Sequence, residues 1–215
     1  MGADKGHPGG QAAGIIFVLM GTTFSVVGEA VDYFGRRFGH RPGTVCIIPT
    51  AQTRPYAELA KQSLIRRYNF QPPYVRIEQV SIDDVTSTAD FMQLVADLSI
   101  IVDAVISDPR RKGSAEPLMA SITGGRKTMS IAGMIVFSRK NAIVVDTRSH
   151  TADDDRALLS QISARVREGL PPEEIYDNFG NVVDDLAFRK ADIAYEIPHI
   201  SIDVSRSAEG YSDVL

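Results

Sequence analysis

Three short segments of this sequence combine glycine, hydroxyl-bearing and basic residues in a way that suits phosphate binding. They are residues 21–25 (Gly-Thr-Thr-Phe-Ser), 49–54 (Pro-Thr-Ala-Gln-Thr-Arg) and 123–128 (Thr-Gly-Gly-Arg-Lys-Thr). Glycine lets a ligand approach the backbone N–H groups closely, and Ser and Thr add hydroxyl donors. In the third segment two glycines precede Lys127, which supplies a mobile cation. Each loop alone is weak evidence, and the third is the strongest.

Several better-known catalytic and nucleotide-binding motifs do not fit the sequence. A P-loop needs glycine directly before its lysine and a second glycine five residues earlier, where this chain has Arg126 and Ser121. No G-x-G-x-x-G fingerprint follows the first strand, and no G-x-S-x-G nucleophile elbow occurs. The histidines at positions 7, 40, 150 and 199 lack metal-ligand spacing. We therefore expect neither a metal nor a cofactor.

Each of the three segments follows an apolar run and precedes a stretch with helical periodicity. Alternation of this kind predicts an α/β fold with a largely parallel sheet and helices on both faces. Ligands of such sheets bind at the carboxyl ends of the strands, where loops lead into helix N-termini. The expected strands are 15–20, 44–48, 74–80, 117–122 and 142–145, and the expected helices are about 25–38, 55–68, 87–107, 126–137 and 152–168.

The pattern divides the chain into three parts. Residues 1–14 are polar and Gly-rich and are expected to be disordered, and residues 15–168 form the domain. Residues 169–215 form a short C-terminal appendage, which opens with the breaker Gly-Leu-Pro-Pro and has an acidic excess. Its one strand-like run, 197–204, is interpreted as an edge strand, a lid or a dimer contact.

Composition limits the classes of function. The 215 residues are 44% hydrophobic and 23% charged, a balance typical of a soluble globular protein, and no membrane span is expected. Its one cysteine, Cys46, lies in an apolar strand, so no internal disulfide can form and a reducing cytoplasm fits. The net charge of −4 argues against binding of long nucleic acid, although small basic clusters remain compatible with a small polyanion.

The third segment also carries a family resemblance. Residues 119–130 (Met-Ala-Ser-Ile-Thr-Gly-Gly-Arg-Lys-Thr-Met-Ser) closely resemble the S-I-x-G-G-R-K-T-M signature of CRISPR-associated CARF proteins, most of all the Csm-type ring nuclease branch. Residues 21–31 resemble that family's G-T-[ST]-P-x-V-V-T-E-T-L segment, with Phe24 in place of proline. Residues 82–90 more loosely resemble its D-I-R-T-x-x-D region.

The resemblance implies a Rossmann-like CARF domain that binds cyclic oligoadenylate, most often the tetra-adenylate, across a homodimer. It assigns Lys127 to the scissile phosphate and Thr23 to the ribose, while the substitution at Phe24 leaves open whether Thr23 or Ser25 supplies the hydroxyl. It gives Gly124 and Gly125 as backbone donors, and Gln52 and Arg54 as lining of the adenine or phosphate pocket. The remaining expected ligand-binding residues belong to the same loops: Gly21, Thr22, Thr50, Thr123, Arg126 and Thr128.

The resemblance further implies a metal-independent ring nuclease. The ribose 2′-OH attacks its neighbouring phosphate and gives linear products with a 2′,3′-cyclic phosphate, which switches off type III CRISPR signalling. No R-x4-H motif of a HEPN ribonuclease occurs, so that activity is not expected. Two alternatives remain: a non-catalytic sensor that regulates a partner protein, and an unrelated nucleotide-binding enzyme of Rossmann-like fold.

Overall fold

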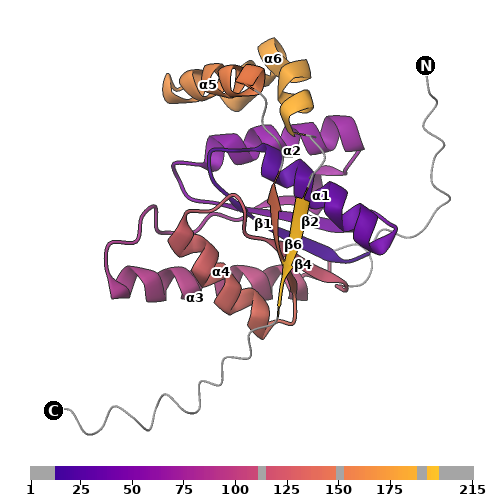
Figure 1. Cartoon of the computed structure of the whole chain (residues 1–215), viewed down its shortest axis with the longest axis vertical. Helices are drawn as coiled ribbons and strands as arrows, with labels where there is room; N and C mark the ends of the chain where they lie inside the picture. Colours follow the sequence, from indigo (N-terminus) through magenta and orange to yellow (C-terminus); the bar gives the residue numbers. More distant parts are fainter. Residues whose placement is uncertain (1–12, 111–114, 149–152, 188–192, 199–215) are drawn as a thin grey trace, which may run out of the picture.

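The computed structural model describes residues 13–110, 115–148, 153–187 and 193–198. Strands and helices alternate through most of this part of the chain (Figure 1). In chain order the elements are β1 (Ile15–Met20), α1 (Ser25–Phe38), β2 (Thr44–Pro49), α2 (Arg54–Tyr68), the 3-10 turn η1 (Pro72–Tyr74), β3 (Val75–Ile77), α3 (Thr88–Ser107), β4 (Leu118–Ser121), α4 (Lys127–Arg139), β5 (Ile143–Arg148), α5 (Asp153–Arg167), α6 (Pro172–Ala187) and β6 (Ile193–Ile197).

The described strands form one sheet in the order β3-β2-β1-β4-β5-β6. All neighbours are parallel except β5 and β6, which pair antiparallel. This is the doubly wound order of Rossmann-like folds, in which the chain winds outward from β1 in one direction and from β4 in the other. The predicted α/β class with a largely parallel sheet is confirmed.

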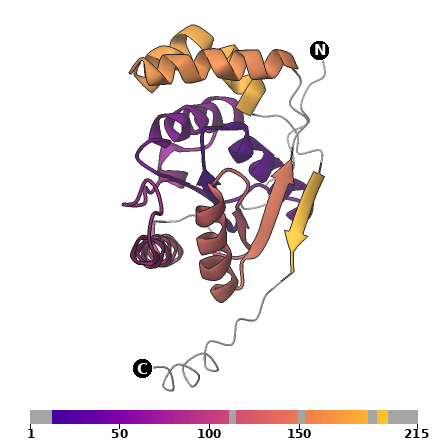
Figure 2. The same cartoon turned by 60° about the vertical axis from the view of Figure 1, so that its left-hand side comes forward.

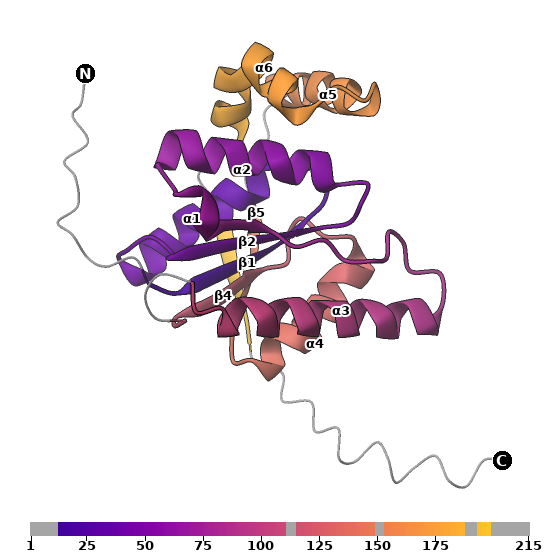
Figure 3. The same cartoon turned by 180° about the vertical axis from the view of Figure 1, so that it is seen from behind.

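Both faces of the sheet are buried, which explains why β1 is an unbroken apolar run. Ile16, Val18 and Met20 pack in a core with α1, α2 and α6. The intervening residues of β1, Ile15, Phe17 and Leu19, pack in a second core with α3 and α4. Figure 3 shows the two helix pairs on opposite sides of the sheet, with α5 and α6 lying beyond α1 and α2.

Several boundaries differ from those expected. β3 is shorter than 74–80, although Glu78 and Val80 still donate backbone hydrogen bonds to β2. β5 is longer than 142–145, because β6 pairs with it from Val144 to Arg148 and extends the ladder (Figure 2). The fold also begins before Ile15: Gly14 is buried and its carbonyl accepts a hydrogen bond from the Gly43 amide at 3.0 Å. Residues 1–12 lie outside the described part.

The C-terminal part contains a helix that the sequence analysis did not predict. Helix α6 packs on α1 and α2 through a row of apolar residues that includes Ile175, Tyr176, Val183 and Leu186. An edge strand is present, but at Ile193–Ile197, so the expected run at 197–204 meets it at Ile197 alone. Residues 199–204 of that run lie outside the described residues.

Candidate functional site

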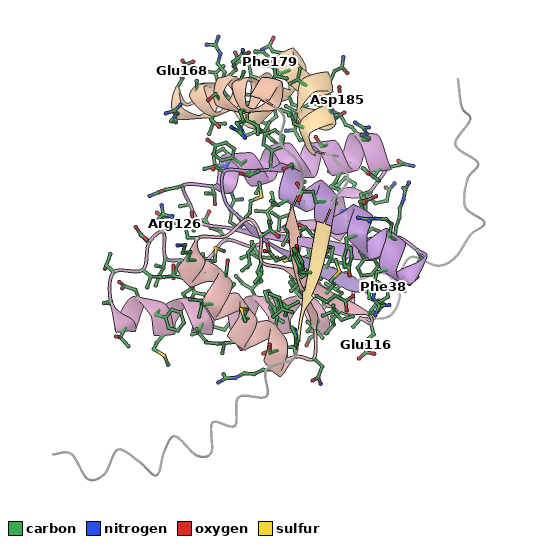
Figure 4. All side chains as sticks on the ribbon, viewed as in Figure 1. Phe38, Glu116, Arg126, Glu168, Phe179 and Asp185 are labelled. Carbon is green, nitrogen blue, oxygen red and sulfur yellow. The ribbon has the colours of Figure 1, made fainter. Side chains whose placement is uncertain are left out.

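The candidate site lies at the carboxyl edge of the sheet, between β1 and β4. The strand order reverses direction there, and doubly wound folds bind their ligands at this point. The loop after β1 (residues 21–24) and the loop after β4 (residues 122–126) therefore meet at one edge. In Figure 4, Arg126 marks this edge at the left, whereas Phe38 and Glu116 lie at the right.

Two glycines allow these loops to touch through their backbones. A Cβ placed on Gly21 would lie 2.1 Å from the carbonyl oxygen of Gly124. A Cβ on Gly124 would lie 2.5 Å from the carbonyl oxygen of Leu19 and 2.8 Å from the Val26 side chain. Only glycine fits at either position, so both residues have a structural task that is independent of any ligand.

Phe24, which stands where the resembled family has proline, anchors the first loop. It occupies the N-cap position of α1, and its side chain is fully buried in the core with α1 and α2. The neighbouring Thr22 and Thr23 are exposed, whereas Ser25 is buried. Thr23 and Ser25 both line the cleft, so the structure leaves the choice of hydroxyl open.

The loops enclose an open cleft of about 810 Å³. This volume lies within the range of about 300–1,000 Å³ that is typical of small-molecule sites. Nine of the thirteen expected site residues line it: Gly21, Thr22, Thr23, Ser25, Gln52, Thr123, Gly124, Gly125 and Arg126.

Three helices begin at this edge, and no side chain caps any of them. The first turns of α1, α2 and α4 have no side-chain cap and no acidic residue. By contrast, α3 is capped by the Ser87 hydroxyl, which accepts a hydrogen bond from the Asp90 amide. Uncapped N–H groups and the positive end of the helix dipole favour an anion, so the edge is suited to phosphate.

Arg126 links the third loop to two other segments. Its guanidinium donates a 3.2 Å hydrogen bond to Gln52 Oε1 and forms a 2.7 Å ion pair with Asp84. The hydrogen-bonded Arg126 guanidinium holds the pKa of the Asp84 carboxyl below its usual range. The backbone N–H of Gln52 in turn donates to Asp83 Oδ1 at 3.3 Å. Arg126 thus ties together the loops that follow β2, β3 and β4.

Other threonine hydroxyls hold the loops in shape. Thr53 donates to the carbonyl of Met20 at 3.1 Å and accepts from the Thr50 amide at 3.0 Å. Thr123 accepts a hydrogen bond from the Thr147 amide at 2.7 Å. Thr50 is buried behind the cleft, and its hydroxyl lies 3.3 Å from that of Thr53. Thr50 and Thr123 therefore have structural roles whether or not a ligand is bound.

Four expected site residues do not line the cleft. Thr50 and Thr128 border a small neighbouring hollow beside Asp84. Arg54 points elsewhere, with its guanidinium 3.4 Å from Gln79 Oε1 and 3.5 Å from Glu58 Oε1. Lys127 is the exposed first residue of α4, and within the described residues no ion pair holds its ammonium group.

Sequence reasoning missed two charged residues of the cleft. Glu29 lies one turn after Ser25 on α1, and this spacing of four could have indicated that the two share a face. Arg167 comes from the last turn of α5, together with Val166. Its guanidinium donates to the carbonyl of Ser163 at 3.2 Å. Only the packing of α5 over the sheet edge brings Arg167 here, so no local pattern could have shown it.

The described residues contain neither a metal-binding cluster nor a membrane-spanning helix. No group of three or more His, Cys, Asp or Glu side chains among them is arranged to hold a metal ion. None of the helices in this part of the chain is long and apolar enough to cross a membrane.

Comparison with solved structures finds distant likenesses. They are the protein VC1899 from Vibrio cholerae (8% identity, TM-score 0.46), Can2 from Sulfobacillus thermosulfidooxidans in complex with cyclic tetra-adenylate (13%, 0.42) and Enterococcus italicus Csm6 bound to cyclic hexa-2′-fluoro-hexa-dAMP (11%, 0.44). The matches cover 63%, 62% and 86% of this chain but only 30%, 32% and 41% of those chains. The chain therefore spans less than half the length of each.

Sequence comparison gives a more specific result. No curated protein matches the chain. A family described as CRISPR-associated protein NE0113 matches residues 25–140, which include the Gly-Gly-Arg-Lys-Thr-Met run and helices α1 to α4. Because this match spans more than half of the chain, the protein belongs to the CRISPR-associated protein NE0113 family, in agreement with the resemblance carried by residues 119–130.

Proposed function

We propose that this protein binds a cyclic oligoadenylate, with cyclic tetra-adenylate as its preferred ring, in the cleft between β1 and β4. The observation that carries the proposal is the convergence of three helix N-termini, none with a side-chain cap or an acidic residue in its first turn, on a cleft lined by Arg126 and Arg167. Such a site suits a ligand with several phosphates and modest size. The match to a CRISPR-associated family and the CARF-type signature at 119–130 favour the cyclic oligoadenylates among ligands of that kind.

The proposal includes a homodimer. A symmetric ring placed on a two-fold axis meets the same groups from both subunits, so each cleft contacts half of the ligand. The position of Lys127 supports this arrangement. Lys127 is the exposed first residue of α4, next to the cleft-lining Arg126, but it does not itself line the cleft. A ring that extends past one cleft towards a second copy would meet Lys127 at that boundary.

The proposal also includes cleavage of the ring without a metal ion. The ribose 2′-OH loses its proton to water as its oxygen forms a bond to the adjacent phosphorus, the bond from phosphorus to the 5′-oxygen breaks, and the leaving 5′-oxygen takes up a proton. The protein orients the 2′-OH in line with the leaving oxygen, a task for the hydroxyl of Thr23 or Ser25. The helix N-termini and Lys127 stabilise the charge that develops on the phosphate. Cleavage would end a type III CRISPR signal.

We expect the protein to act in the cytoplasm, where a free thiol stays reduced. Cys46 is the one cysteine of the sequence, and it is fully buried in β2. Burial raises the pKa of its thiol, so Cys46 is inert and takes no part in the proposed reaction.

The test is incubation of the purified protein with radiolabelled cyclic tetra-adenylate in EDTA. The parent and Lys127→Ala are compared, with Lys140→Ala as a matched control because Lys140 lies beyond the far end of α4 and pairs with Asp103. The proposal predicts linear products from the parent and the control and a rate reduced at least about tenfold in Lys127→Ala. Binding without cleavage would replace the nuclease with the sensor, and neither binding nor cleavage of tri-, tetra- or hexa-adenylate rings would overturn the proposal.

A further inference from the structure

Glu29 is unusual among the described residues because it is a buried charged side chain. It is only 2% exposed, and it is the one Asp, Glu, Lys or Arg that the described part of the chain buries. Removing a carboxylate from water is costly unless strong partners compensate, so such residues are rarely fully buried. Buried ionisable groups that border a cleft are frequently functional.

The position of Glu29 connects it with the proposed ligand. Helix α1 begins at Ser25, and Glu29 follows it by four residues on the same helical face. Both side chains line the cleft, whereas the neighbouring Val27 and Ala30 pack into the core. Glu29 therefore lies deeper in the cleft than the exposed Thr22 and Thr23 at its mouth.

The carboxylate makes this part of the cleft different from the rest. An ionised carboxylate accepts hydrogen bonds, offers no donor and repels phosphate. Glu29 is already engaged by the protein in at least one polar or electrostatic contact. A carboxylate has about four lone-pair positions on its two oxygens, which leaves capacity for a ligand donor.

We propose that Glu29 is a specificity residue that accepts a hydrogen bond from a donor on the adenosine unit. The inference rests on the proposed function. The cleft is then divided into a phosphate-binding side, formed by Arg126, Arg167 and the helix N-termini, and an acceptor side formed by Glu29. An adenosine unit has two groups from which Glu29 could accept a hydrogen bond, the exocyclic amine of the base and the ribose 2′-OH.

Binding measurements with three rings distinguish the exocyclic amine from the ribose 2′-OH as the donor to Glu29. Cyclic tetra-adenylate is compared with the tetra-inosinate ring, in which a carbonyl replaces the amine, and with the 2′-deoxy tetra-adenylate ring, which lacks the hydroxyl. Binding is measured by competition on a timescale shorter than cleavage. The parent is expected to bind one of the two analogues about 10- to 100-fold more weakly than cyclic tetra-adenylate, the range for losing a hydrogen bond to a charged group.

Glu29→Gln is expected to reduce that discrimination to less than about 10-fold. A glutamine amide has nearly the same shape but both donates and accepts, so it also satisfies a carbonyl, and its neutral oxygen accepts a weaker hydrogen bond from a hydroxyl than a carboxylate does. Asp32→Asn is the matched control, because Asp32 lies one turn further along α1, outside the cleft, and pairs with Arg36 at 2.9 Å. That control should keep the selectivity of the parent.

The outcomes distinguish this inference from the proposed function. If Glu29→Gln loses discrimination against the inosine ring, the exocyclic amine is the donor to Glu29. If it loses discrimination against the deoxy ring, the ribose 2′-OH is the donor. A parent that binds all three rings equally overturns the inference even if Glu29→Gln does not fold, and so does unchanged selectivity in a folded Glu29→Gln. A parent that binds none of the rings overturns the proposed function itself and this inference with it.

Discussion

Replacing Gly21 with alanine tests whether the loops after β1 and β4 touch as described. The added Cβ would lie 2.1 Å from the carbonyl oxygen of Gly124, so the two backbones must separate by about 1.3 Å to reach an ordinary van der Waals contact. Both loops leave strands that are buried on both faces, which limits such movement. Forcing atoms into a packed site typically costs about 1–3 kcal/mol.

For a chain of this size each kcal/mol changes Tm by about 2–4 °C, so Gly21→Ala should lower Tm by about 2–12 °C. Gly35→Ala is the matched control, since a Cβ at Gly35 in α1 meets no atom within 4 Å. That substitution should raise stability by about 0.5–1 kcal/mol through helix propensity. Thermal unfolding followed by circular dichroism measures both variants. A Gly21→Ala protein as stable as the parent would refute the described contact between the loops.

Three further predictions concern charged and titrating residues. Arg167→Gln should weaken binding of cyclic tetra-adenylate about 5- to 20-fold and lower the salt dependence of binding. Arg165→Gln should change neither, because Arg165 pairs with Glu168 outside the cleft. Binding titrations at several salt concentrations measure both variants, and equal effects would contradict binding of the ring beside Arg167. Burial and a hydrogen bond to Asp184 raise the pKa of Tyr176 to about 12, so the stability that its neutral form contributes is present below pH of about 10 and lost as pH rises through 12. Urea unfolding across that pH window should show a smaller loss of stability in Tyr176→Phe than in the parent, and an identical loss would contradict this role of Tyr176. In Arg126→Gln the pKa of Asp84 should rise towards its usual value, as followed by carboxyl NMR titration; an unchanged pKa would exclude the ion pair.

Local sequence patterns predicted most of the elements and the edge at which the candidate cleft lies. The apolar run at Ile15–Met20 and the helical spacing after Ser25 are signals that reside in the segments themselves. Parallel strands place their carboxyl ends at one edge, so three polar loops that each follow a strand had to lie near one another. Their proximity therefore follows whatever the order of the strands in the sheet.

The remaining features depend on contacts between distant segments. Arg167 reaches the cleft because α5 packs over the sheet edge, and β5 is long because β6 extends its ladder. Helix α6 had a readable signal, since its apolar residues from Ile175 to Leu186 follow helical spacing, but the acidic excess around them obscured it. The structural roles of Gly21 and Gly124 were not predictable, because each is required by the backbone of another loop.

Hydrogen exchange of the backbone amides with and without cyclic tetra-adenylate tests directly whether the ring binds between β1 and β4. We expect slower exchange in residues 21–27 and 122–129, where N–H groups of α1 and α4 without side-chain caps would bind phosphate. Exchange should be unchanged around the separate hollow of about 540 Å³ between α2 and α6, which Arg66, Tyr176 and Asn181 help to line. Protection confined to that hollow, or no protection at a saturating concentration of the ring, would exclude binding in the cleft between β1 and β4.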